Sequence, residues 1–287
     1  MPAPVSTRLP LKLRHDRMPL AKPHIGSAPF DLIAENYDRI FTDPQIGRAQ
    51  RSAVRRVLEK EFHREHRVLE IGCGTGEDAC FLAERGVEVV ACDSSSGMLA
   101  VTTQKVAIRG LQHLVKPHLI GAEEIGSLEG SFDGVFSNFG VLNCVPDLSA
   151  LAKSLGRLLR PGAAMLLCLM GPCCWWEIAW YLAHGNPRKA FRRLRRGGVT
   201  ARLAGGTPVR VYYPRVSSLA HAFAPHFRLR AIKGVGVLVP PSYLEFWANR
   251  FPPLLRFAVH ADAILEGCPG VRLLADHVLL TFERGGV

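Results

Sequence analysis

The feature that most constrains the fold is a short apolar strand that runs directly into a glycine-rich turn and then into a helix. Val68 to Gly76 reads VLEIGCGTG, and a helical pattern begins at Glu77. Glycine allows the tight backbone of such a turn and lets a ligand lie close to the main chain. The spacing is G-x-G-x-G, which differs from the G-x-G-x-x-G of dinucleotide-binding folds. This segment therefore predicts a nucleotide-binding unit of an α/β fold.

The charges beside this turn favour a cationic cofactor over a pyrophosphate. The predicted helix begins with Glu77 and Asp78, and two carboxylates at a helix N-terminus would repel a phosphate group. A second strand, Val87 to Cys92, is followed by Asp93, about twenty residues after the turn, where an acidic side chain can accept hydrogen bonds from both ribose hydroxyls of a nucleoside. Together, these elements disfavour NAD and favour a sulfonium cofactor.

Four segments carry a resemblance to a known family. They are EIGCGTG at Glu70 to Gly76, Asp93, GAEEI at Gly121 to Ile125, and SFDGVFSN at Ser131 to Asn138. In this combination, residues 30–170 resemble the class I S-adenosylmethionine (SAM)-dependent methyltransferases. The resemblance implies SAM as the cofactor and methyl transfer as the activity. The alternative is a turn that only packs and an Asp93 that only caps a helix, and the joint placement of the two argues against it.

The resemblance also assigns residues to the cofactor site. That set consists of Tyr37, Glu70, Gly72, Cys73, Gly74, Asp93, Ser94, Met98, Ala122, Glu123, Asn138 and Phe139. Glu70 would support the methionine amino group beside the glycine turn, and Asp93 would hold the ribose. Where the family often has G-D-A-E, this chain has Gly121, Ala122 and Glu123, so the Ala122 backbone and the Glu123 side chain are the expected adenine contacts.

The remaining assignments concern the edges of the cofactor site. Ser94 and Met98 would flank the adenine, and Tyr37 would close over the cofactor. Asn138 and Phe139 follow a predicted strand and would lie where the cofactor and the substrate meet.

Alternation of strands and helices predicts the fold class. The strands are expected at 67–71, 87–92, 118–120, 132–137 and 163–169, and the intervening helices at 77–85, 95–109 and 148–159. This order is typical of a Rossmann-like, doubly wound, mostly parallel sheet. We also expect helices at 30–40 and 47–61, a helical cap insertion and a final antiparallel strand at 277–284.

Four parts of the chain follow from this pattern. Residues 1–29 are predicted to be a disordered arm, because they are rich in Pro, Arg and Lys without apolar periodicity. Residues 30–170 would form the SAM-binding domain with its N-terminal helices, and residues 171–226 a basic and aromatic cap insertion. Residues 227–287 would complete the sheet.

The net charge of +11 is concentrated in one segment. From Ile178 to Leu244 there is no acidic residue, while the basic ones are Arg188, Lys189, Arg192, Arg193, Arg195, Arg196, Arg202, Arg210, Arg215, Arg228, Arg230 and Lys233. Such a segment is either a solvated surface or an attractor for an anionic partner.

Three classes of function fit these features. The first is methylation of an O or N atom of a bulky, partly apolar small molecule, such as a natural-product or lipid-like biosynthetic intermediate with an anionic group. The second is RNA methylation, with the arginine run at 192–196 on phosphates. The run SNFG at Ser137 to Gly140 lacks the N-P-P-Y pattern typical of enzymes that methylate base amines. The third is a non-catalytic scaffold, which the intact glycine turn and Asp93 disfavour.

A catalytic base does not stand out, because methyl transfer can rest largely on orientation and proximity. His184, His221 and Tyr212 are weak candidates in the cap. The aromatic stretch Trp175 to Tyr181 either walls a substrate pocket or packs the cap helix onto the sheet. The basic run at 188–196, which contains Phe191 and Leu194, could also rest on anionic lipid as a peripheral contact.

The remaining patterns concern metals and location. Eight cysteines lie in apolar contexts and form no C-x-x-C pair, so we expect reduced thiols and no metal site. No window is apolar enough over the length of a membrane-spanning helix, and no secretory leader is visible. These patterns predict a cytoplasmic protein.

Overall fold

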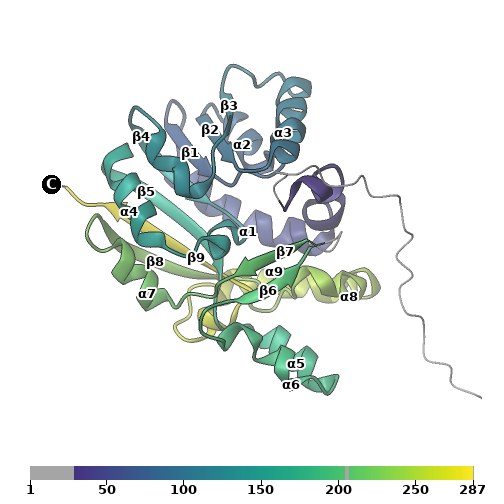
Figure 1. The fold of residues 1–287 in the computed structure, drawn as a ribbon. Coiled ribbons are helices and arrows are strands. Elements are labelled where there is room, and N and C mark those ends of the chain that lie inside the picture. The colour runs from purple at the N-terminus through teal and green to yellow at the C-terminus, as the bar shows by residue number, and fades with distance from the viewer. Residues whose placement is uncertain (1–28, 204–206, 287) are drawn as a thin grey trace, which may run out of the picture.

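The computed structural model describes residues 29–203 and 207–286, and their central element is a seven-stranded sheet (Figure 1). Its order is β3-β2-β1-β4-β5-β9-β8. The strands are β1 (Arg67–Ile71), β2 (Glu88–Asp93), β3 (Val115–Leu119), β4 (Phe132–Ser137), β5 (Leu159–Met170), β8 (Phe227–Val235) and β9 (His277–Arg284). Strands β1 to β5 pair in parallel, and β9 runs antiparallel to β5 and β8. The predicted Rossmann-like sheet with an antiparallel C-terminal strand is confirmed.

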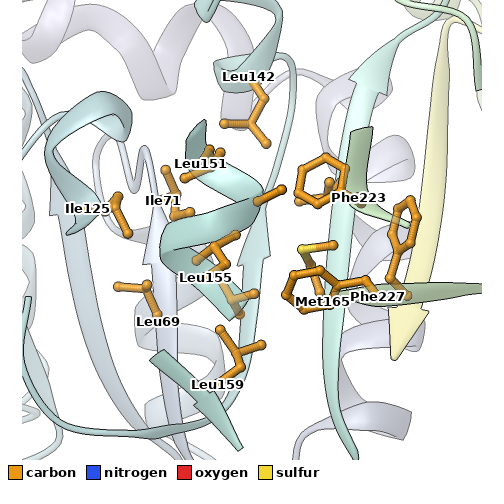
Figure 2. Packing of buried hydrophobic residues seen from close by; sticks show 14 of the residues in the cluster. Leu69, Ile71, Ile125, Leu142, Leu151, Leu155, Leu159, Met165, Phe223 and Phe227 are labelled. Carbon is orange, nitrogen blue, oxygen red and sulfur yellow. The ribbon is translucent and has the colours of Figure 1, made fainter. Parts of the chain in front are cut away.

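Helices cover both faces of this sheet, as a doubly wound fold requires. The flanking helices are α1 (Gln45–Glu61), α2 (Glu77–Ala83), α3 (Ser96–Ile108), α4 (Leu148–Leu158) and α7 (Val216–Phe223). Alternate residues of β1 point to opposite faces, so Leu69 and Ile71 pack with α4 and α7 while Val68 packs with α1 and α2. Figure 2 shows Leu69 and Ile71 facing Leu151 and Leu155 of α4, with Phe223 of α7 beside Met165 of β5.

The strand order places a crevice at the carboxyl end of β1. The chain runs outward from β1 through β2 to β3 and then returns to form β4 on the other side of β1. Ligands of open α/β sheets bind at such a reversal of strand order, outside the carboxyl ends of the strands. The loops that follow β1, β2 and β4 therefore meet at one place.

Two insertions interrupt the regular alternation. The first follows β5 and contains α5 (Trp175–Ala183), α6 (Pro187–Ala190), η5 (Arg192–Leu194) and an antiparallel hairpin of β6 (Val199–Arg202) and β7 (Pro208–Val211). The second separates β8 from β9 and contains η6 (Ser242–Leu244), α8 (Glu245–Arg250), α9 (Pro252–Leu265) and η7 (Val271–Leu274). The sequence analysis anticipated helices in the first insertion but neither the hairpin nor helices between the last two strands. The division of the chain at 170 and 226 stays a prediction.

Two expected elements were placed wrongly. The third strand begins at Val115 and ends at Leu119, earlier than the expected 118–120, because it is an edge strand that is largely exposed and tolerates Pro117. The expected helix at 30–40 is divided into η1 (Asp31–Asn36) and η2 (Asp38–Thr42). Side chains from both pieces bind to segments around the glycine turn and α3. Asp31 Oδ1 accepts from Gly97 N, and Asp38 Oδ1 accepts from Thr75 Oγ1. The predicted arm lies outside the described residues, apart from Pro29.

Candidate functional site

A cavity of about 390 Å³ lies at the carboxyl ends of β1, β2 and β4. Every residue that the resemblance assigned to the cofactor lines it, from Tyr37 in the N-terminal segment to Phe139 after β4. The structure thus brings the complete set together around one space, and their individual roles toward a cofactor stay predictions. Further lining residues come from elements that were not predicted to be at the site: Arg51, Ile120, Cys144, Val145, Pro208, Val209 and Arg210.

The glycine turn after β1 needs its glycines for steric reasons. Gly72 has a φ of +72°, and a Cβ at this position would lie 2.3 Å from Val141 Cγ1. Gly76 has a φ of +74°, and its Cβ would lie 2.6 Å from Thr102 Cγ2. Gly72 N and Cys73 N both donate to Cys92 O, at 2.8 and 2.9 Å, which ties the turn to the end of β2. The turn is therefore a preformed backbone surface on the cavity wall.

Asp93 holds this turn in place. Its Oδ2 accepts from Gly74 N at 2.8 Å, and its Oδ1 accepts from Ser95 N at 2.9 Å. Burial raises the pKa of the Asp93 carboxyl, although its backbone hydrogen bonds counteract the shift. Each carboxylate oxygen offers two lone pairs, so both oxygens retain acceptor capacity toward the cavity.

Glu70 is the most unusual polar group of the site. Its side chain is 3% exposed, and Oε2 has no hydrogen-bond partner among the described residues. Burial, reinforced by the nearby Asp78 carboxylate, raises the pKa of Glu70 well above its usual range. A buried acceptor without a donor costs free energy, and an ammonium group in the cavity would supply the donor. The residues present therefore fit the amino group of a SAM methionine moiety.

The carboxylates at the start of α2 are neutralised within the protein. Asp78 pairs with Arg51 at 2.5 Å and with Arg55 at 2.9 Å, and Glu77 pairs with Lys105 at 2.7 Å. Burial opposes ionisation of Asp78, but the two guanidinium groups outweigh it and lower the pKa of that carboxyl. The argument that free carboxylates here repel a pyrophosphate was therefore wrong. The preference for a cationic ligand rests on Glu70 instead.

Arg51 organises the wall opposite the glycine turn. Its guanidinium carbon lies 4.7 Å from the centre of the Phe139 ring, and Asn138 Nδ2 donates to the same Asp78 carboxylate at 2.9 Å. Arg51 Nε and Asn138 Oδ1 are buried without a hydrogen-bond partner among the described residues. The sequence offered no signal for Arg51, because it is one of several arginines on an ordinary amphipathic helix.

The hairpin strand β7 closes the cavity on its outer side. Pro208, Val209 and Arg210 line the cavity there, together with Cys144 and Val145. The Arg210 guanidinium donates to Gly197 O, at 3.0 Å from Nε and 2.5 Å from Nη2. Within 29–203 and 207–286 it forms no ion pair with a carboxylate, so this wall is apolar with one cation.

The three candidate catalytic residues do not line the cavity. His184 is exposed, and its ring packs on Trp180 with 4.1 Å between ring centres. His221 is exposed on α7. Tyr212 uses its backbone to bind Asn143, whose O accepts from Tyr212 N at 2.7 Å. The structure does not bring the three together.

The aromatic stretch after β5 packs the first insertion against the second. Trp176 Nε1 donates to Leu238 O at 3.1 Å, and the Trp176 and Trp247 rings lie 5.9 Å apart. Trp175 Nε1 donates to Val237 O. These are packing contacts, as one of the two interpretations expected, but they are made with the second insertion and not with the sheet.

Comparison with known proteins agrees with the fold. Residues 68–162 match the family model described as a methyltransferase domain. A demethylmenaquinone methyltransferase of Clavibacter sepedonicus is 33% identical over 147 residues, which cover 51% of this chain and 58% of that protein. The chain thus spans less than two thirds of the length of such relatives.

Solved structures show the same fold over most of the chain. A putative S-adenosylmethionine-dependent methyltransferase from Listeria monocytogenes superposes with a TM-score of 0.60 at 15% identity, covering 83% of this chain and 98% of that one. The CcbJ methyltransferase from Streptomyces caelestis gives a TM-score of 0.59 at 18% identity, covering 92% and 100%.

The match and the fold agree with each other. Residues 68–162 match a methyltransferase domain, and the chain has the fold seen in class I SAM-dependent methyltransferases. The cofactor of this class is SAM, which agrees with the prediction from the glycine turn and Asp93.

Proposed function

We propose that this protein transfers the methyl group of SAM to an oxygen or nitrogen atom of a bulky, partly apolar small molecule, such as a natural-product or lipid-like biosynthetic intermediate. The observation that carries the proposal is the buried, unpartnered Glu70 Oε2 beside the glycine turn and Asp93, in a cavity that continues to the apolar wall of β7. The named acceptor of the demethylmenaquinone methyltransferases is also a small molecule.

The residues of the cavity divide into two groups in this proposal. Glu70 would accept hydrogen bonds from the amino group of SAM, the backbone of Gly72 and Gly74 would bind the methionine moiety, and Asp93 would accept from the ribose hydroxyls. Bound in this way, SAM supplies an electrophilic methyl group. The protein orients the two reactants and excludes water, and these effects can account for a large part of the rate enhancement of such a reaction.

The outer wall is proposed to bind the acceptor. Val145 and Val209 offer apolar surface. Among the described residues, Arg210 donates to Gly197 O and Thr200 Oγ1 and not to a carboxylate, so it suits an anionic group on the acceptor. No base is assigned, because the predicted candidates lie outside the lining residues.

RNA methylation is less well supported. Two arginines of the run at 192–196, which would have to contact phosphates, form ion pairs with carboxylates of the protein itself. Arg192 Nε donates to Glu177 Oε1 at 2.6 Å, and Arg193 is buried between Glu177 and Asp276.

Calorimetric titration of the full chain with SAM and with NAD tests the cofactor. Formation of S-adenosylhomocysteine from SAM in the presence of each member of a panel of phenols, amines and carboxylates tests the reaction. We expect saturable SAM binding, no NAD binding and turnover of an apolar acceptor. SAM binding with turnover of RNA only would establish the alternative. Absence of SAM binding would favour the third alternative, a non-catalytic scaffold.

A further inference from the structure

The second insertion presents large apolar side chains to solvent. We call this the exposed apolar face and define it by Tyr243, Phe246, Phe251, Leu254, Phe257 and Ile264. Phe246 is 58% exposed, Phe257 65% and Ile264 77%. Scattered surface apolar residues are normal, but six large ones within the 22 residues from Tyr243 to Ile264 are a candidate interaction site.

Helix α9 shows that this exposure is not a by-product of core packing. Leu255 and Ala258 form its buried side and pack with Leu244 and Ala248. Leu254, Phe257 and Ile264 are spaced by three and seven residues, so they form a second apolar stripe on a different side of the helix. This stripe contributes nothing to the core of the described chain.

Aromatic contacts join this face to the basic first insertion. The Phe246 ring lies 5.8 Å from Trp180, and the Tyr243 ring lies 6.3 Å from Tyr181. Lys189 Nζ lies 5.5 Å from the centre of the Tyr181 ring. Figure 1 shows α5, α6 and α8 at one end of the molecule, opposite α2 and α3.

Cations border the exposed apolar face, whereas the carboxylates of Glu245 and Asp262 near it accept hydrogen bonds from backbone N–H groups. The Arg250 guanidinium lies 5.4 Å from the Phe251 ring centre, and Arg256 is exposed on α9. Glu245 accepts from Gln45 N at 2.6 Å, and Asp262 accepts from Leu238 N at 2.5 Å. The surface is therefore apolar and cationic, which is complementary to a layer of acyl chains under anionic headgroups.

We propose that the exposed apolar face docks on the surface of a lipid bilayer that carries anionic lipids. Phe246, Phe257 and Ile264 enter the boundary between headgroups and acyl chains, and Lys189, Arg250 and Arg256 lie against the headgroups. Such contact is peripheral, because the described part of the chain contains no helix with the length and apolar character of a bilayer span. The proposal goes beyond methyl transfer and does not depend on it.

The test is co-sedimentation of the full chain, without SAM, with vesicles of pure phosphatidylcholine or of phosphatidylcholine and phosphatidylglycerol in equal amounts. We expect binding to the anionic vesicles that weakens as salt is added. The double variant Phe246→Ser/Phe257→Ser should lower the partition coefficient by roughly tenfold or more, because interfacial binding scales with buried apolar area. The control is Ile108→Ser, which removes an apolar side chain that is 77% exposed on α3.

Folding is checked by the unfolding midpoint and by SAM titration, which the serine variants should leave unchanged. Absence of binding to anionic vesicles, or equal loss with Ile108→Ser, would overturn the proposal. So would a concentration-dependent dimer in sedimentation velocity that the double variant abolishes and that does not bind vesicles, because a second copy would then be the occupant. Vesicle binding by a protein that does not bind SAM would support this proposal and reject the proposed function.

Discussion

The cofactor half and the inserted half of the molecule are stabilised in different ways. Around the cavity, the glycine turn is fixed by backbone hydrogen bonds to neighbouring β2 and by Asp93, which are short-range features of one βαβ unit. The insertions are joined by a buried cluster in which Arg193 pairs with Glu177 of α5 at 2.9 Å and with Asp276 before β9 at 2.8 Å. The first region is a preformed ligand surface, whereas the second depends on charges far apart in sequence.

The largest effect is expected from breaking the buried cluster. Arg193→Met removes the cation between two buried carboxylates and should cost about 3 to 5 kcal/mol of unfolding free energy, because uncompensated buried charge is expensive. Urea denaturation measures it. The control is Arg195→Met, an exposed neighbour whose loss should cost under about 0.5 kcal/mol. Equal effects of the two changes would mean that the cluster does not hold the insertions.

The next largest effect is expected at the glycine turn. Gly72→Ala combines a positive φ with a clash against Val141, and we expect a loss of about 2 to 4 kcal/mol of stability together with weaker SAM binding. Gly110→Ala is the matched control, since its φ is +68° but nothing lies within 4 Å of the added Cβ. It should cost about 1 kcal/mol. If Gly72→Ala behaves like Gly110→Ala, the turn is not sterically fixed.

A smaller effect is expected on cofactor affinity. Asp93→Ala should weaken SAM binding by about 1 to 3 kcal/mol, because one or two buried hydrogen bonds are lost. Titration calorimetry measures the change. Asp147→Ala removes a comparable carboxylate that caps α4 away from the cavity, and it should leave SAM affinity unaltered. Unchanged affinity in Asp93→Ala would place the ribose elsewhere.

The smallest effect is expected on how steeply the free energy of unfolding changes with pH. The pKa of Glu70 is raised in the folded protein above its ordinary value of 4.5. As the pH rises above that value, the unfolded chain releases this proton first, so this residue lowers stability with increasing pH. Glu70→Gln removes that contribution, and its stability should fall less steeply than that of the wild type in urea denaturation at several pH values. Parallel curves would contradict the burial of this carboxyl.

These experiments also separate what was predictable from what was not. The strand, the glycine turn and Asp93 are close together in the sequence, and backbone sterics require glycine in the turn. The sequence pattern therefore predicted them, and they line the cavity. The electrostatic argument from Glu77 and Asp78 failed, because their partners Arg51 and Lys105 come from helices that pattern alone does not bring to α2. The sequence placed Arg210 in a basic segment but did not predict that it lines the cavity.

The sequence by itself determined the doubly wound sheet, which follows from short-range periodicity, and the glycine turn with Asp93, which lie close together in the chain. The other predicted lining residues came from the resemblance to SAM-dependent methyltransferases. Only the tertiary structure decided that β7 closes the cavity and that Arg193 is buried instead of solvated. It also decided that α9 carries a second apolar stripe facing solvent. These features depend on which distant segments pack together, and packing between distant segments leaves no local signature in the chain.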